Sequence, residues 1–179
     1  MKPDIRVLAR LTVIKKQQDE MKILFDDYVS HYKNIEDYVT EYSGILPGDL
    51  EYGKSEKKLH YRQETFRKFW TLIKRNCRII GHGLKSDFTG INIKVPESQV
   101  IDTAMIYWNG GRLLSLKYLF HKMFGQSIQD NNHDSYEDAY AAFVLYEKYK
   151  EMKEKDEEEW DKFTKELFKE AKKSNYKIE

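Results

Sequence analysis

A histidine and an aspartate near the carboxyl-terminal third of the chain have the types and spacing to do chemistry. His133 lies five residues before Asp138, in a loop that leads into a predicted helix. Histidine can move a proton near neutral pH, and aspartate oxygens are ligands that Mg²⁺ accepts. The pair could therefore serve as a general base beside a carboxylate that binds a metal ion or accepts hydrogen bonds.

Asp138 also has a purely structural interpretation. Ser135 and Asp138 match a capping box, in which a hydroxyl and a carboxylate three residues later satisfy the first turn of a helix. Against this, Asp138 falls on an apolar stripe of its helix, which continues with Ala142, Leu145 and Tyr149. An aspartate that faces the domain interior is costly without a partner, so we expect Asp138 to have one.

A second acidic residue, Asp87, follows a short apolar run. The segment 79–88, IIGHGLKSDF, is typical of a strand that runs into His82 between two glycines, with Asp87 five residues later. Carboxylates just beyond strand ends lie at the rim of a sheet, where open α/β folds bind ligands. Asp87 could equally cap the helical turn that follows, and we expect His82 to be a packed loop histidine.

Hydrophobic periodicity predicts the strands that must position these groups. Residues 5–14 alternate as a half-buried strand, and the run 21–29 predicts a second strand, joined to the first as a hairpin with a longer loop. The short runs RIIGHGL and SQVIDT, the latter closed by Asp102, predict two more strands. Because helices alternate with these strands, we expect a sheet with crossover helices.

The predicted helices complete a single domain over residues 1–179. They cover 35–42 after an Asn34 cap and before Gly44, 55–76, Ser115 to Gly125, Ser135 to about Met152, and 156–173. The last helix sets Trp160, Phe163, Leu167, Phe168 and Ala171 on one stripe, which we expect to dock on the domain. The charged stretch 151–159 is typical of a solvated linker or helix face.

Composition limits the class of protein. The 179 residues include 31 Lys and Arg against 30 Asp and Glu, with 40% apolar and 14% aromatic residues, which excludes disordered and collagen-like chains. The single cysteine, Cys77, has no intramolecular disulfide partner, and no apolar stretch approaches a membrane span. We therefore expect a reduced, intracellular protein. A net charge of +1 predicts that any nucleic-acid contact is local.

Seven segments together resemble a known family. They are LARLTVI, FDDYV, EDYVTEYSGILPGDL, GHGLKSDFTGINIKVPESQVIDT, RLLSLKYLF, IQDNNHDSYEDAYAAFVLYEKY and the tail SNYKIE. They resemble the DEDDh family of 3'-to-5' exonucleases, and most closely the nuclease domains of the catalytic subunits of poly(A)-nuclease deadenylation complexes. The YSGILPGDL and VPESQVIDT segments separate this branch from relatives such as oligoribonuclease.

The resemblance implies a fold, a cofactor and roles for three residues. The fold is α/β, a ribonuclease-H-like mixed sheet with flanking helices. Two Mg²⁺ ions are held by four carboxylates, of which Asp87 matches the third and Asp138 the fourth, while His133 matches the general base. The resemblance also implies poly(A) RNA 3' ends as substrate, an adaptor subunit as partner, cytoplasmic mRNA turnover and no membrane.

One departure from the family pattern matters for activity. The first two carboxylates of the family form an Asp-x-Glu on the first strand, and only Met1–Asp4 precede the first predicted strand here. Asp26–Asp27 match a structural turn after the family's third strand, and Asp4 lies at the terminus. We therefore expect a domain that lacks its first strand, through truncation or a faulty gene prediction. It should bind Mg²⁺ weakly or not at all and be weakly active or inactive, with an unpaired strand edge.

Two other functions stay open at this point. The absent Asp-x-Glu suits a non-catalytic, exonuclease-like module that binds RNA or a protein without cleaving it. A different DEDDh nuclease, acting on other RNA or DNA ends, would use the same Asp87, His133 and Asp138.

Overall fold

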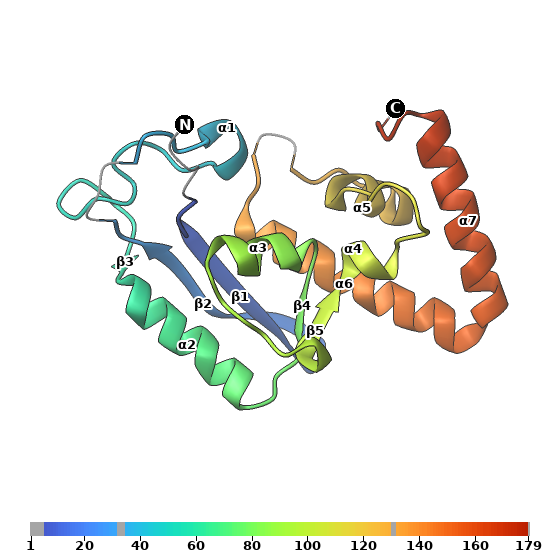
Figure 1. The fold of residues 1–179 in the computed structure, drawn as a ribbon, viewed down its shortest axis with the longest axis horizontal. Coiled ribbons are helices and arrows are strands. Elements are labelled where there is room, and N and C mark those ends of the chain that lie inside the picture. The colour runs from blue at the N-terminus through green and yellow to red at the C-terminus, as the bar shows by residue number, and fades with distance from the viewer. Residues whose placement is uncertain (1–5, 32–34, 130–131, 179) are drawn as a thin grey trace.

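The computed structural model describes residues 6–31, 35–129 and 132–178 of the chain. The strands are β1 (Arg10–Gln17), β2 (Glu20–Val29), β3 (Leu59–His60), β4 (Ile79–Gly81) and β5 (Val100–Asp102). The helices are α1 (Thr40–Ser43), α2 (Arg62–Lys74), α3 (Leu84–Gly90), α4 (Thr103–Ile106), α5 (Leu116–Phe124), α6 (Ser135–Lys155) and α7 (Glu157–Lys173), with a 3-10 turn over Glu97–Gln99. Figure 1 shows this α/β arrangement, with α2 and α6 flanking the strands.

The strands form two sheets. In the first, the order is β1-β2-β3, with β1 and β2 antiparallel and β2 and β3 parallel. In the second, β4 and β5 are parallel. The mixed strand directions and flanking helices confirm the predicted α/β class. Within the described ranges, β1 and β4 each have a strand partner on one side only, and both pack on α6 (Figure 1).

The amino-terminal hairpin is tighter than its sequence predicts. Gln17 pairs with Glu20, so the turn has two residues, and Gln18 takes the left-handed conformation with φ 57°. The prediction of a longer loop was therefore wrong. The pairing of β1 with β2 also begins at Arg10 and not near residue 5. The reason is that β2 ends at Val29, and the N–H of Ser30 donates to the carbonyl of His60 in β3 instead.

Two predicted helices are shorter than expected. The helix predicted over 35–42 is confined to α1, because the Asp37 carboxylate accepts the Val39 N–H at 2.7 Å and Val39 adopts φ 49°. The predicted stop at Gly44 is confirmed by its left-handed φ of 66°. The predicted cap Asn34 and the terminal Asp4 both lie outside the described residues.

The helix predicted over 55–76 begins only at Arg62. Leu59 and His60 instead form β3 against β2, and a capping box between Tyr61 and Glu64 starts α2. Pairing with a neighbouring strand thus overrides the helical pattern in the first part of this segment. The predicted limits of α5, a Ser115 cap and a Gly125 stop, are both confirmed.

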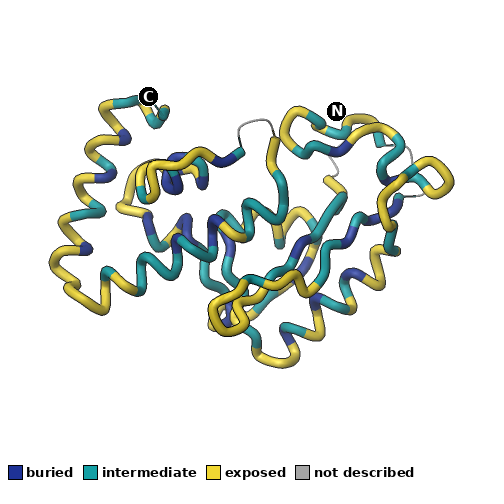
Figure 2. The backbone as a smooth tube through the Cα atoms, turned by 180° about the vertical axis from the view of Figure 1, so that it is seen from behind, coloured by how far each residue is buried: buried dark blue, intermediate teal, exposed yellow. Residues whose placement is uncertain are grey.

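The larger core lies between α5, α6 and α7. Trp160 of α7 is buried, with its ring 5.2 Å from Tyr107 and 5.0 Å from Tyr149 in edge-to-face contacts. Leu167 and Ala171 continue the buried stripe of α7. Figure 2 shows buried positions on the inner side of α7 and exposed positions on its outer side. Charged residues of the 151–159 stretch end α6 and begin α7 and are mostly exposed.

A smaller core lies between the strands and α2. Its buried members are Phe69, Ile73 and Ile93. The apolar side chains packed around them are only partly buried: Leu11, Val13, Phe25, Phe66, Ile79, Phe88, Ile91 and Val95. This core is therefore incompletely covered beside β1 and β4.

No helix in the described ranges is both long and apolar enough to cross a bilayer.

Candidate active site at the start of α6

The first turn of α6 is capped by Asp134 and not by Ser135. The Asp134 carboxylate accepts the N–H groups of Tyr136 at 2.9 Å and Glu137 at 3.1 Å. The predicted capping box of Ser135 and Asp138 was therefore wrong, because the residue one position earlier reaches the free N–H groups first. As a result, Asp138 is not used to cap the helix.

Asp138 has two side-chain partners, as its position on the apolar stripe predicts. One oxygen, Oδ2, lies 3.3 Å from Nδ1 of His133, and the other, Oδ1, accepts the Gln129 amide at 2.5 Å. Gln129 is itself held in a left-handed conformation with φ 57°, and its backbone N–H donates to Glu137. A non-glycine residue in this conformation at a functional site is held there by its surroundings.

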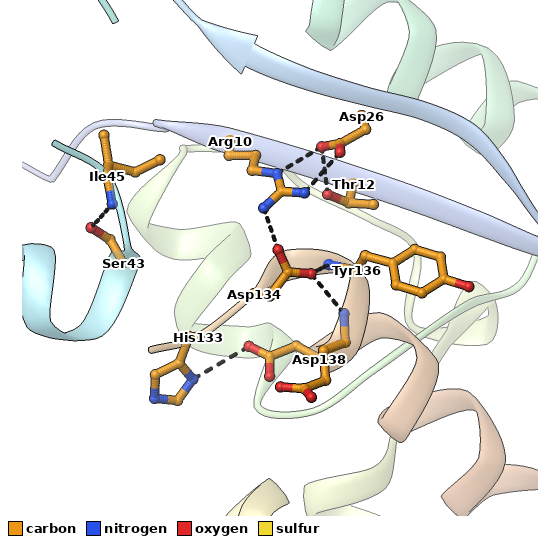
Figure 3. A network of polar contacts seen from close by, with 10 residues as sticks. Arg10, Thr12, Asp26, Ser43, Ile45, His133, Asp134, Tyr136 and Asp138 are labelled. Carbon is orange, nitrogen blue, oxygen red and sulfur yellow. Dashed lines mark hydrogen bonds and ion pairs between the residues drawn. The ribbon is translucent and has the colours of Figure 1, made fainter. Parts of the chain in front are cut away.

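His133 presents its ring to solvent beside α1. Its backbone N–H donates to the Tyr42 carbonyl at 2.7 Å, and the two rings lie 6.4 Å apart. Figure 3 shows Nδ1 turned toward Asp138 and the second ring nitrogen turned away. If Nδ1 carries the proton that Asp138 accepts, Nε2 is free to take a proton from a water molecule, which is the arrangement that a general base requires.

Asp87 lies on the first turn of α3, after the carboxyl end of β4. The α3 N-cap is Gly83, which makes no side-chain cap, so Asp87 does not cap this helix and the structural alternative was wrong. Although its side chain reaches solvent, partial desolvation raises the pKa of Asp87, and the negative charges of Asp102 and Asp138 raise it further. Asp87 and Asp138 are thus electrostatic neighbours.

His82 is a packed histidine, as expected. Its ring nitrogens lie 3.0 Å from the Thr103 hydroxyl and 3.0 Å from the Leu114 carbonyl. Burial lowers the pKa of His82, which favours the neutral ring. Asp102 is also structural: it accepts N–H groups from Gly83 and Ala104 and caps α4.

The raised pKa of Asp87 gives a stability prediction. A folded-state pKa above the unfolded value of about 4 means that the protonated form contributes stability at low pH, and that this contribution is lost as the pH rises through the folded-state pKa. Asp87→Asn keeps the shape and removes the charge. We expect it to melt at a higher temperature than the wild type at neutral pH and at the same temperature below about pH 4. A lower melting temperature at pH 7 would contradict this.

Arg10 of β1 joins the start of α6 to the sheet. Its guanidinium donates to both oxygens of Asp26 at 2.8 Å and to Asp134 at 2.7 Å, as Figure 3 shows. The contact with Arg10 holds the pKa of Asp26 below its usual value. Burial opposes ionisation of Asp134, but Arg10 and the helix N–H groups outweigh it and lower its pKa as well.

Replacing Arg10 with leucine should test this connection. We expect a loss of about 1–2 kcal/mol of unfolding free energy, because two partly exposed carboxylates lose their partner. Since the pKa values of Asp26 and Asp134 are lowered, their contribution is present above the unfolded value and lost as the pH falls below about 4. Urea unfolding at pH 7 and pH 3 should therefore show a smaller difference between wild type and variant in acid.

The pair Asp26–Asp27 belongs to β2 and not to a turn, which corrects the expected match. Asp26 is engaged by Arg10 and Thr12. Asp27 is almost completely buried and accepts hydrogen bonds from Thr65 and Lys68 at 2.8 Å. Both carboxylates therefore have structural partners.

The donor set does not amount to a complete two-metal centre. Asp87 and Asp138 offer oxygen ligands of the type that Mg²⁺ takes. However, in the part of the chain that the structure describes, no group of three or more His, Cys, Asp or Glu side chains is arranged to hold a metal ion. These residues therefore fall short of the four-carboxylate set that the resemblance implies.

Sequence reasoning identified Asp87, His133 and Asp138 as candidate site residues but missed the residues around them. Arg10 and Gln129 were not identified, since the first is 124 residues from Asp134 and the second is set by an unusual backbone conformation. Tyr42, which is 60% exposed, gave no signal beyond its aromatic type.

The fold and the histidine–carboxylate site together define a ribonuclease-H-like nuclease. Residues 1–146 match the family model for the RNase_T exonucleases, and the chain belongs to this exonuclease family. The family generally depends on divalent metal ions.

Named relatives share this fold over most of the chain. The PAN2-PAN3 deadenylation complex catalytic subunit PAN2 of Saccharomyces cerevisiae is 43% identical over 180 residues, which cover 99% of this chain and 16% of that protein. The structure of the S. cerevisiae Pan2 pseudoubiquitin hydrolase-RNA exonuclease module in complex with A7 RNA matches with a TM-score of 0.92 and 43% identity, over 99% of this chain and 30% of that one. The Neurospora crassa Pan2 catalytic unit matches with a TM-score of 0.77 and 36% identity, over 96% and 27%. The chain thus spans about one sixth of the length of such catalytic subunits.

Proposed function

We propose that this chain is the nuclease part of a 3'-to-5' exoribonuclease that shortens poly(A) tails. The observation that carries the proposal is the His133–Asp138 contact of 3.3 Å beside Asp87, in a chain of the exonuclease family. The relatives support the substrate, since they are catalytic subunits of deadenylation complexes and one exonuclease module was solved with A7 RNA.

The proposed chemistry assigns a role to each of these side chains. His133 accepts the proton of a water molecule that attacks the last phosphodiester. The bond from phosphorus to the 3' oxygen breaks, that oxygen takes up a proton, and a nucleoside 5'-monophosphate leaves. Asp138 orients the His133 ring, and we propose Asp87 and Asp138 as Mg²⁺ ligands that need further oxygen donors to complete a site.

Tyr42 is placed to hold the terminal base. It is 60% exposed, and its ring lies beside that of His133. An exposed aromatic ring can stack on a nucleotide base of any sequence. A base held there would bring its phosphate toward His133.

A gel assay tests the proposed function. The substrate is 5'-labelled RNA that ends in an A-tail, with Mg²⁺ or with EDTA, and RNA and DNA of other 3' ends serve as comparisons. We expect EDTA to abolish any stepwise shortening and A-tailed RNA to be shortened fastest. Equal rates on all ends would contradict the deadenylase proposal and favour a nuclease of broader substrate range.

The short donor set favours a second candidate, a non-catalytic module that binds RNA. Among the described side chains, Asp87 and Asp138 are the proposed ligands and no larger metal-binding group is formed. Such a module predicts RNA affinity that does not change when Mg²⁺ is added. A strong dependence of RNA binding on Mg²⁺ would contradict this alternative.

We also propose that the whole protein binds an adaptor subunit and acts in the cytoplasm. The relatives are named as subunits of the PAN2-PAN3 complex, which supports a similar adaptor for the whole protein. We propose that the protein acts in cytoplasmic mRNA turnover, as the resemblance implies. Affinity capture of the tagged protein from a cytoplasmic fraction should recover that adaptor.

A further inference from the structure

Positive charge is concentrated in one segment of this nearly neutral chain. Residues 54–78 contain nine Lys and Arg and two Glu, although the whole chain has a net charge of +1. The segment covers the loop before β3, the whole of α2 and the turn before β4. A chain that is almost neutral as a whole therefore contains one strongly basic segment.

Most of these basic side chains have no acidic partner. Within the described ranges, only Lys54 and Lys68 of the segment pair with a carboxylate, those of Glu51 and Asp27. The lysines of α6 differ, because several pair with glutamates: Lys148 with Glu151, Lys150 with Glu147, and Lys153 with Glu157. Internal ion pairs thus neutralise much of the charge of α6 but leave that of α2 available.

Exposed aromatic rings accompany the basic side chains. Tyr52 is 52% exposed and Tyr61 is 42% exposed, and their rings lie 5.6 Å apart. Lys57 lies over the ring of Tyr28 in β2 at 5.6 Å. Along α2, a surface hollow of about 440 Å³ is lined in part by Arg67 and Lys68.

The loop before β3 links this surface to the candidate active site. Tyr42 of α1 accepts the His133 N–H, and the chain runs from α1 through the loop 44–58 to β3 and α2. The loop is fixed to the end of β2, where His31 donates to the Leu50 carbonyl at 3.4 Å. Figure 1 shows the loop and α2 on the same side of the molecule as α1.

We propose that residues 52–75 form a binding surface for single-stranded RNA upstream of the 3' end in the active site. The inference rests on the proposed function, which places the 3' end at His133. Unpaired basic side chains suit the phosphate backbone, and exposed tyrosines suit base stacking without sequence preference. A surface of this kind would hold long tails more tightly than short ones.

RNA binding by the whole 179-residue chain tests the surface without any cleavage. Fluorescence anisotropy in EDTA would compare oligoadenylates of about 5 and about 20 nucleotides, lengths that bracket typical single-strand sites. The charge variant is Lys58→Gln, Arg67→Gln and Lys74→Gln together. We expect a loss of about tenfold in affinity for the long RNA, and a decrease of about 2 in the slope of log affinity against log salt. Affinity for the short RNA should change less than about twofold, since it reaches few of these phosphates.

The charge variant has a matched control, and a second test addresses the aromatic rings. In the control, Lys162→Gln, Lys165→Gln and Lys169→Gln together remove the same charge from exposed positions of α7 and should leave both affinities unchanged. Tyr52→Ala should lose about tenfold for the long RNA through lost stacking, whereas Tyr52→Phe, which keeps the ring, should retain the affinity.

The outcomes separate this inference from the proposed function. Equal affinity of the wild-type chain for both RNA lengths, or equal losses in the α2 and α7 variants, would overturn the surface. Binding of the long RNA without the short one would contradict the proposed active site and leave the surface standing. If the charge variant kept full RNA affinity but weakened the contact with another part of the longer protein, the surface would be a protein interface and the inference would be wrong.

Discussion

An Asp-x-Glu segment placed before residue 1 is expected to raise the rate of poly(A) shortening by about 10³-fold over the 179-residue chain alone. Metal ions contribute several kcal/mol of transition-state stabilisation in such reactions, and each 1.4 kcal/mol is about tenfold in rate. The described residues supply Asp87 and Asp138 but no larger group of metal-binding side chains. Two more carboxylates would bring the donor set to the number that the resemblance implies.

The sheets offer a place for such a segment. β1 and β4 belong to separate sheets, each has an open side, and both pack on α6. The core beside them is incompletely covered, since Leu11, Val13 and Ile79 are only partly buried. A β-type segment that paired with both strands would cover these side chains. Its acidic residues would then lie near the carboxyl end of β4, where the chain leads to Asp87.

The extended chain should also be more stable and less prone to self-association, because unpaired strand edges invite edge-to-edge pairing. The matched control carries Asn-x-Gln in the same segment, which should restore stability but not activity. Initial rates on 5'-labelled A-tailed RNA, thermal melting and light scattering measure these effects. EDTA-sensitive shortening by the chain alone at the rate of the extended form would show that the added carboxylates are not needed, and would contradict this prediction.

The second large effect concerns His133. In the extended, active form, His133→Ala should reduce turnover by about 10²-fold or more, the usual contribution of a general base. The fold should be unaffected, because the ring is exposed and, among the described residues, its one polar contact is with Asp138. Single-turnover rates at saturating enzyme measure the chemical step, and melting temperature reports on the fold.

The matched control for this variant is His121→Ala, which removes a histidine from another helix, α5. It should leave the rate within about twofold, although its stability should be measured, since Nδ1 of His121 is buried. The dependence of the rate on pH gives a further readout. The wild-type rate should fall in acid, as a reaction that uses a histidine base requires, whereas His133→Ala should lose this acidic decrease. Full activity of His133→Ala would show that another group takes the proton.

Local rules in the sequence predicted a good part of this molecule. Ser115 and Gly125 set the limits of α5 because a hydroxyl cap and a left-handed glycine act within one helical turn. The short apolar runs at β4 and β5 predicted two strands in a sheet with crossover helices, because each is a brief β-type segment and a helical turn separates them. The structure shows that these two strands are parallel. The spacing of His133 and Asp138 likewise predicted that they lie on the same side of the helix start, and the structure places their side chains 3.3 Å apart.

Long-range contacts decided the rest. Leu59 and His60 left the predicted helix because β2 offers them a strand partner, and no local pattern records that partner. Asp134 and not Ser135 caps α6, and its carboxylate is fixed by Arg10 from the other end of the chain. This pairing leaves Asp138 free for His133 and Gln129. The sequence by itself therefore predicted which residues are candidates for the chemistry, whereas the tertiary structure decided what surrounds them, because hydrogen bonds and ion pairs between distant segments outweigh local preference.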